Sequence, residues 1–338
     1  MLFGLVGSEM CIRDSPGGSS PAEMTLFSSR DGLLAGFDAG QTHTRCRLSQ
    51  RDGRVVAEGE GSGVSHISSE NGPERFQRAL QSSLEAAQRQ GGDASKPLAA
   101  AAIGASGIEQ NSPTQSLGTS LARQALKLDA VLVTGDERTA LAGAFAPGQA
   151  GISLISGTGA IAVGQDEGGR QHRCAGWGWL VDGVGSAMDI GRDGLALTLR
   201  MADGRLQETT LKTELWAALG VQQAHELKAL VVNADFGAAG FARLAPVVHQ
   251  QALAGELHAQ RIVQQAADEL AFMVMGVAQA LELEAPALCC SGGAISHLTL
   301  LRQSMDAALK ERLPGLHHVE PQGDACDGAL RLAQALSS

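Results

Sequence analysis

Two aspartates in this sequence stand where a carboxylate could do chemistry. The first, Asp38, follows the apolar run Leu33–Phe37 and precedes a short turn of glycine and hydroxyl residues. A carboxylate in this position can hold a hydrated metal ion, while the N–H groups of the turn face phosphate oxygens. Many β-hairpins carry Asp and Gly in their turns, so an ordinary hairpin is the alternative.

The second aspartate, Asp136, comes just after the apolar run Ala130–Thr134 and just before a helical pattern. In such a place an aspartate can be a general base that takes a proton from a substrate hydroxyl. It can also be the N-cap of the following helix, which is the simpler interpretation of this residue alone.

Two glycine-rich turns also follow apolar runs. Ser156–Ala160 reads SGTGA, and its glycines permit close approach of a ligand to the backbone. Gly292 and Gly293 follow the run Ala287–Ser291, where they would admit a flat base or a phosphate. The alternative in both cases is a tight turn without a ligand.

The loop Gly176–Ser186 contains two of the three tryptophans in the chain. Tryptophan beside glycine can form an apolar wall for a sugar ring, or it can fill the core. No strand–helix–strand unit precedes the loop, so it is not a dinucleotide-binding fingerprint. The chain has no Gly-Lys pair for a P-loop, and neither an H-E-x-x-H nor a G-x-S-x-G motif.

The predicted elements fall into two similar halves. Strands at 33–38, 44–49 and 54–59 form an antiparallel meander, and helices alternate with strands at 98–103 and 130–134. A second group of strands begins at 151–156, 160–165 and 171–174, with later strands at 287–291 and 317–320. Helices are expected at 71–90, 115–126, 186–201, 206–219, 224–232, 241–254, 256–283, 298–312 and 324–336.

Each half therefore begins with a hairpin whose turn contains glycine and threonine, at 39–44 and at 156–160. Two such turns can face each other across a cleft and grip one polyphosphate. A hinge between the halves would let the cleft close and exclude water.

Composition excludes several classes of protein. The 338 residues suggest about two domains, and the net charge of −10 with a pI near 5.4 argues against nucleic-acid or anionic-membrane partners. Apolar runs are interrupted before they reach roughly 18–20 residues, the length of a membrane span. The six cysteines include no C-x-x-C pair, which predicts free thiols in a reducing cytoplasm rather than zinc ligands or disulfides.

The first thirty residues are expected to lie outside the fold. Met1–Ser15 begins with apolar residues but lacks the basic start and sustained apolar stretch of a signal peptide, and it resembles translated sequencing-adapter text. The Gly-, Ser- and Pro-rich stretch that follows has no helical or strand periodicity. We therefore assign residues 1–30 to a non-native or disordered N-terminal extension.

In their order and spacing, these stretches resemble the sugar kinase/actin/Hsp70 superfamily. More narrowly they resemble the BadF/BadG/BcrA/BcrD ATPase family and its N-acetylglucosamine and glucosamine kinases. The resemblance covers Leu33 to Ala335 and rests on FDAGQTHTR, TGDERTALAGA, ISLISGTGAIAVG, CAGWGWLVDGVGSAMDIGRDGL, CCSGGAISH and PQGDACDGALRLA.

The resemblance implies an α/β fold: a two-domain actin-like ATPase (ribonuclease H-like) fold with an interdomain cleft. The N-terminal ATPase domain would comprise 31–134, with the C-terminal helix 324–338 packing back on it. The C-terminal ATPase domain would comprise 135–323. A homodimer is usual for such kinases.

The resemblance also implies an activity, the transfer of the γ-phosphate of ATP to the 6-hydroxyl of N-acetylglucosamine or glucosamine. Asp38 would bind Mg²⁺ through water, and Asp136 would be the catalytic base. The implied nucleotide contacts are Gly40, Gln41, Thr42, His43, Thr44, Ser156, Gly157, Thr158, Gly159, Gly292 and Gly293. The implied sugar contacts are Ser65, His66, Ser106, Gly107, Cys174, Gly176, Trp177 and Asp182.

Three positions depart from the family pattern. His43 replaces the usual Lys or Ser of the first turn, and Ser65-His66 replaces an expected sugar-contacting Asn. The family's acidic residue in GDEGS or SDQGS appears one position early, as Asp182, and Val184 stands beside it. Because Asp38 and Asp136 are both present, these changes indicate altered substrate preference rather than loss of activity.

Two other functions fit the same fold. An ATPase activator of a radical dehydratase needs cysteines that hold an iron–sulfur cluster at a dimer face, and Cys289-Cys290 at the end of a core strand is poorly placed for that. A non-catalytic sugar sensor that regulates transcription would need a DNA-binding module, for which residues 1–30 are too short.

Overall fold

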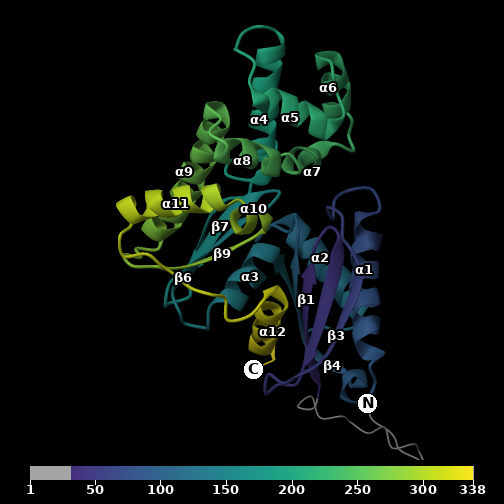
Figure 1. The fold of residues 1–338 in the computed structure, drawn as a ribbon. Coiled ribbons are helices and arrows are strands. Elements are labelled where there is room, and N and C mark those ends of the chain that lie inside the picture. The colour runs from purple at the N-terminus through teal and green to yellow at the C-terminus, as the bar shows by residue number, and fades with distance from the viewer. Residues whose placement is uncertain (1–31, 338) are drawn as a thin grey trace, which may run out of the picture.

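Two five-stranded β-sheets with the same strand order form the framework of the structure, a computed structural model that describes residues 32–337 (Figure 1). The first sheet has the order β3-β2-β1-β4-β5, with β1 (Leu33–Ala39), β2 (His43–Ser49), β3 (Val55–Ser62), β4 (Leu98–Ala105) and β5 (Val131–Gly135). The second has the order β10-β9-β6-β7-β8, with β6 (Gly151–Ser156), β7 (Ala160–Gln165), β8 (Gln171–Ala175), β9 (Ala287–Ser291) and β10 (His317–His318).

In both sheets the first three strands form an antiparallel meander, and the last two run parallel to the first. The shared order confirms the predicted duplication of the two halves. Each sheet therefore brings one hairpin turn and one glycine-rich strand end to the same edge.

Helices cover both faces of the first sheet, which explains why β1 is apolar along its length. Alternate residues of β1 point to opposite faces. On one face Leu33 and Phe37 pack in a core with Phe76 of α1 (Gly72–Gln88), and α2 (Pro113–Leu126) lies beside α1. On the other face Leu34 packs with Ala329 of α12 (Ala325–Leu336).

The last helix, α12, follows β10 of the second sheet and returns to the first, where it packs against β1, β4 and α3 (Asp136–Ala144) (Figure 1). Its N-terminus is fixed by a capping box. Asp324 accepts from the Asp327 N–H at 3.1 Å, and the Asp327 side chain accepts from the Asp324 N–H at 3.0 Å.

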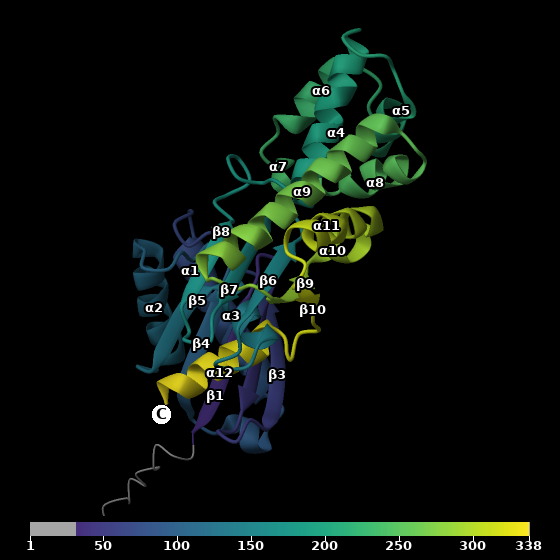
Figure 2. The same cartoon turned by 90° about the vertical axis from the view of Figure 1, so that its left-hand side faces the viewer.

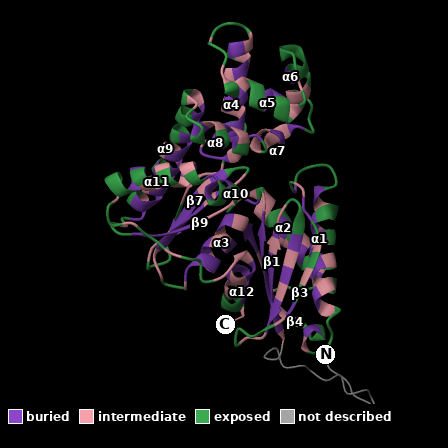
Figure 3. Cartoon of the chain, viewed as in Figure 1, coloured by how far each residue is buried: buried purple, intermediate pink, exposed green. Residues whose placement is uncertain are grey.

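The second half of the chain is mostly helical. Its helices are α4 (Ala187–Ala202), α5 (Thr210–Leu219), α6 (Ala224–Val231), α7 (Gly237–Ala242), α8 (Ala245–Leu253), α9 (Leu257–Ala280), α10 (Gly293–His297) and α11 (Thr299–Arg312). The long helix α9 packs on the second sheet and on α11, and α4 to α8 form a lobe beyond that sheet (Figures 1 and 2). Buried residues follow the sheets and the facing sides of these helices (Figure 3).

Several predicted helix limits were wrong. The single helix expected over 241–254 is two helices, because Pro246 lies in the first turn of α8 and cannot continue a helix from α7. The helix expected from 206 begins at Thr210, after a turn in which Gly204 has φ +82°. The short helices α10 and Gly92–Ser95 were not predicted.

Within residues 32–337, no helix is both long and apolar enough to cross a membrane. Five cysteines of this part of the chain are free thiols, as expected; Cys11 precedes it. The predicted extension, residues 1–30, also lies outside the described residues.

Candidate active site

The turn between β1 and β2 is closed by backbone hydrogen bonds and open to solvent on its outer side. The Gly40 N–H donates to the carbonyl of His43 at 3.1 Å, and the Val64 N–H donates to the carbonyl of Gly40 at 2.9 Å. Gln41, Thr42 and His43 are exposed, as a phosphate-binding turn requires. Thr44 was also expected to contact the nucleotide, but its side chain is fully buried. Its hydroxyl has no hydrogen-bond partner within residues 32–337.

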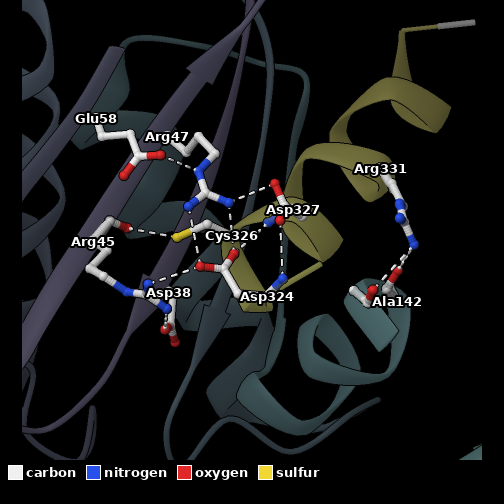
Figure 4. Close-up of polar contacts among 10 residues, drawn as sticks. Asp38, Arg45, Arg47, Glu58, Ala142, Asp324, Cys326, Asp327 and Arg331 are labelled. Carbon is white, nitrogen blue, oxygen red and sulfur yellow. Dashed lines mark hydrogen bonds and ion pairs between the residues drawn. The ribbon is translucent and has the colours of Figure 1, made fainter. Parts of the chain in front are cut away.

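Asp38 lies one residue before the end of β1, and its side chain is 25% exposed. The guanidinium of Arg45, which is its neighbour across the β1–β2 ladder, donates from Nη2 to Oδ2 of Asp38 at 2.8 Å (Figure 4). This ion pair raises the pKa of Arg45 further above its usual high value. The other carboxylate oxygen of Asp38 accepts no hydrogen bond from the described residues.

Asp136 is the first residue of α3, and Gly135 is the N-cap, so the N-cap interpretation of Asp136 was wrong. Its pKa is raised, first by burial and then by the negative charge of Asp38. In the sheet, Asp38 is in register with Gly104 of β4, which is in register with Thr134 of β5. The two carboxylates therefore emerge at one edge of the first sheet, with β4 between them.

The turn of the second hairpin meets the glycines that follow β9. Gly292 has φ +100°, and a Cβ there would lie 2.5 Å from the Ser156 carbonyl oxygen, so only glycine fits. Thr158 and Gly159 are exposed, whereas the buried Ser156 hydroxyl donates to the Gly185 carbonyl at 2.9 Å. The Ser156 hydroxyl is therefore already used within the protein, and the exposed part of this turn is Thr158 and Gly159.

Two of the predicted sugar-contact segments lie together beside the first hairpin. A Cβ on Gly107 would lie 3.1 Å from Cδ2 of His66, so these residues are neighbours. The Ser106 N–H donates to the carbonyl of Ala39 at 3.2 Å, which holds this loop against the end of β1. Ser65 is half-buried and close to His66 in the same loop.

The loop after β8 holds the other predicted sugar contacts. Trp177 is 66% exposed, and its backbone N–H donates to Oδ2 of Asp182 at 3.1 Å. This bond closes the loop and uses one oxygen of Asp182. Gly176 has φ +81° and packs on Ile161. Cys174 points toward α9 rather than toward this loop. Its sulfur would lie 2.9 Å from a Cβ added to Gly276 of α9.

A cavity of about 560 Å³ lies between residues of the two halves of the chain and borders α3 at Glu137 and Arg138, the two residues after Asp136. It is lined by Glu109, Gln110, Asn111, Glu137, Arg138, Gly169, Gln171, Arg173 and Trp177. Arg173 pairs with Glu109 at 2.6 Å and lies 4.0 Å from the ring centre of Trp177. Burial raises the pKa of Glu137 and lowers the pKa of Arg138.

Two nitrogen atoms of this cavity, Nε of Arg138 and Nη2 of Arg173, are buried and make no hydrogen bond within the described residues. Buried donors of this kind call for a partner such as a ligand or water. Sequence reasoning named only Trp177 here. The signal it could have used is position, since Glu137 follows Asp136 and Arg173 precedes Cys174.

The residues around Asp38 fit a magnesium ion that is held mainly by substrate and water. Within residues 32–337, no three His, Cys, Asp or Glu side chains are grouped to hold a metal. Mg²⁺ commonly uses one or two carboxylates and takes its other ligands from water and phosphate oxygens. One half-buried carboxylate with a free oxygen at the edge of an open hairpin suits that chemistry.

A sequence model of the BadF/BadG/BcrA/BcrD ATPase family matches residues 35–333. The chain belongs to this family. A glucokinase of the ROK family from Streptomyces griseus, solved with glucose and AMPPNP, shares the fold at 17% identity, with a TM-score of 0.53 over 90% of this chain and 99% of that one. The predicted family and the predicted actin-like ATPase fold class are both confirmed.

Three proteins similar to this chain carry the names of amino-sugar kinases. The chain is 27% identical over 304 residues to the N-acetylmuramic acid/N-acetylglucosamine kinase of Clostridium acetobutylicum, covering 89% of this chain and 98% of that protein. It is 28% identical over 187 residues to N-acetyl-D-glucosamine kinase of Dictyostelium discoideum, covering 54% and 59%. A candidate N-acetylglucosamine kinase from Chromobacterium violaceum has a TM-score of 0.71 at 29% identity, covering 89% and 99%.

Proposed function

We propose that this chain is an ATP- and Mg²⁺-dependent amino-sugar kinase that phosphorylates the 6-hydroxyl of N-acetylglucosamine, glucosamine or a close relative of them. The observation that carries the proposal is the placement of Asp136. This carboxylate has a raised pKa and emerges beside Asp38, at the edge of the sheet where the first hairpin turn opens. The names of the family relatives support the same activity.

In this mechanism Asp136 accepts the proton of the sugar hydroxyl as that oxygen bonds to the γ-phosphorus, while the bond from the γ-phosphorus to the β–γ bridging oxygen breaks and ADP leaves. A raised pKa makes a carboxylate a stronger base, provided that it is still ionised at the working pH. The backbone of the turns at Gly40–His43 and Gly157–Gly159 would hold phosphate oxygens. Asp38 would hold Mg²⁺ through water, and the ion would supply positive charge to the phosphates.

The sugar would lie between the loop of His66 and Gly107 and the loop of Trp177, next to the cavity that Glu137 lines. The exposed face of Trp177 offers an apolar surface to one side of a sugar ring. The guanidinium groups of Arg138 and Arg173, which line the cavity, would donate to hydroxyl, amide or acidic substituents of the sugar. A homodimer and a cytoplasmic location remain predictions.

The test is a coupled assay of ADP release with Mg·ATP and a panel of acceptors: N-acetylglucosamine, glucosamine, N-acetylmuramic acid, glucose and no sugar. Release that depends on an amino sugar is expected. ADP release that is equally fast without any sugar would contradict the proposal and favour the alternative of an ATPase that activates a dehydratase. Binding of ATP and sugar without any turnover would favour the alternative of a non-catalytic sugar sensor.

A further inference from the structure

Arg45 links the carboxylate of Asp38 to the start of α12 (Figure 4). Its Nη2 atom donates to Asp38 at 2.8 Å, and its Nη1 atom donates to Oδ2 of Asp324 at 2.9 Å. One guanidinium therefore bridges two carboxylates that are 286 residues apart in sequence. A planar fork with several fixed donors can orient both partners at once, which a lysine ammonium cannot do.

Asp324 is itself firmly held. It caps α12 by accepting from the Asp327 N–H, and its Oδ1 atom accepts from Nη1 of Arg47 at 2.8 Å. Arg47 also binds Asp327 at 2.6 Å and Glu58 at 2.8 Å. Because Asp324 is fixed from several directions, the bond to Arg45 restricts where Arg45, and through it Asp38, can lie.

The two arginines share the partner Asp324, although Arg47 has two further carboxylate partners, Asp327 and Glu58. Both join β2 to the start of α12 through Asp324, but only Arg45 touches Asp38. The cluster of two arginines and four carboxylates (Asp38, Glu58, Asp324 and Asp327) keeps a net negative charge, so Asp38 retains its attraction for a cation. A purely structural role would be shared by Arg45 and Arg47, whereas a role toward Asp38 belongs to Arg45 alone.

We propose that Arg45 is a positioning residue, which holds Asp38 in the orientation that binds Mg·nucleotide and anchors that orientation to α12 through Asp324. The proposal rests on the proposed function, in which Asp38 serves the metal. Without Arg45, the Asp38 side chain is free to rotate, and it must be reordered each time the metal binds. Helix α12 returns from the second sheet to the first, so the metal carboxylate is tied to the segment that joins the two halves.

The test compares Arg45→Gln, Arg45→Lys and Arg47→Gln in the full chain. Binding of ADP is measured by calorimetry at increasing Mg²⁺ concentration without sugar, together with the thermal midpoint. The measured quantity is the Mg²⁺ concentration at which half of the Mg²⁺-dependent rise in ADP affinity is reached. In Arg45→Gln this concentration is expected to be about five- to tenfold higher than in the wild type, a loss of about 1–1.4 kcal/mol in Mg²⁺ binding. Arg45→Lys keeps the charge and should fold, with a smaller change in the same direction.

Arg47→Gln is the matched control, which should lower the thermal midpoint but leave the Mg²⁺ requirement unchanged. Equal Mg²⁺ requirements for the wild type and both Arg45 variants would overturn the proposal. So would tighter Mg²⁺ binding in Arg45→Gln, since Arg45 would then compete with the ion. ADP binding that ignores Mg²⁺ in the wild type would overturn it as well, while Mg²⁺-dependent binding without sugar phosphorylation would remove only the kinase assignment.

Discussion

Asp136 and Asp38 emerge at the same edge of the first sheet, separated by the single strand β4. Burial raises the pKa of Asp136, and the negative charge of Asp38 raises it further. Two carboxylates with unlike surroundings can take different roles in one reaction. Both carboxylates are partly buried, but Asp38 is neutralised in part by Arg45, whereas the raised pKa of Asp136 favours its taking a proton.

Replacing Asp136 by asparagine should remove the base and keep the shape of the site. We expect kcat to fall by about 10²–10⁴-fold, the usual contribution of a positioned base. Binding of Mg·ADP should stay near its wild-type value, because the turns that hold phosphate are untouched. Calorimetry and steady-state turnover on the same samples check this. Full activity in Asp136→Asn would show that another group takes the proton.

The raised pKa of Asp136 can be measured without turnover. A carbon-13 NMR titration of the metal-free protein should give Asp136 a pKa above the ordinary aspartate value of about 3.9. In Asp38→Asn the pKa should move down, because the neighbouring negative charge is gone, but burial should keep it elevated. The base works only when ionised, so activity should fall as the pH drops through this raised pKa. A pKa at or below the ordinary value would refute the geometry described for this pair.

Glycine at position 292 is required by both conformation and space. In Gly292→Ala the new methyl group would lie 2.5 Å from the Ser156 carbonyl oxygen at φ +100°, and we expect a loss of about 1–3 kcal/mol in unfolding free energy. Gly293→Ala is the control, because its Cβ would meet nothing closer than 3.9 Å. Urea unfolding of both variants makes the comparison. Equal stability of the two would mean that the β9 turn is more adaptable than the structure indicates.

The buried carboxylate of Asp189 in α4 predicts how stability changes with pH. Burial raises the pKa of Asp189 to about 6, although Arg192 beside it acts in the opposite direction. An acid whose pKa is higher in the folded state binds its proton more tightly there, so stability falls as pH rises from about 4 through about 6. Asp189→Asn should remove this loss and keep an oxygen to accept from the Gly185 N–H, as Asp189 does at 3.2 Å.

The stability of Asp189→Asn relative to wild type should therefore rise by about 2 kcal/mol between pH 4 and pH 8, as a shift of two pKa units requires. Denaturant unfolding at the two pH values measures the difference. A relative stability that is constant with pH, or that falls, would mean that Arg192 keeps Asp189 ionised throughout.

Local sequence was enough to predict the strands and turns that frame the site. The apolar run before Asp38 and the two glycine-containing turns have strong local signals, and their order along the chain resembles that of a known family. The break between α7 and α8 was missed, although Pro246, which removes a backbone donor inside the helical pattern, was a local signal for it.

Contacts between distant segments were beyond reach of the sequence alone. Arg45 meets Asp324 only because α12 returns to the first sheet, and no local pattern specifies that pairing. The direction of Cys174 depends on Gly276 of α9, which admits the sulfur. The cavity that Glu137 lines likewise needs Glu109 and Arg173, from different halves, to meet.

The most direct test of the central claim is identification of the product. Phosphorus-31 NMR of a reaction with Mg·ATP and N-acetylglucosamine or glucosamine should show a 6-phosphate ester, and the corresponding 6-deoxy sugar should yield none. A phosphate ester at another hydroxyl would contradict the assigned position of transfer. No sugar phosphate with any acceptor of the panel, from protein that binds Mg·ATP, would contradict the assignment of this chain as an amino-sugar kinase.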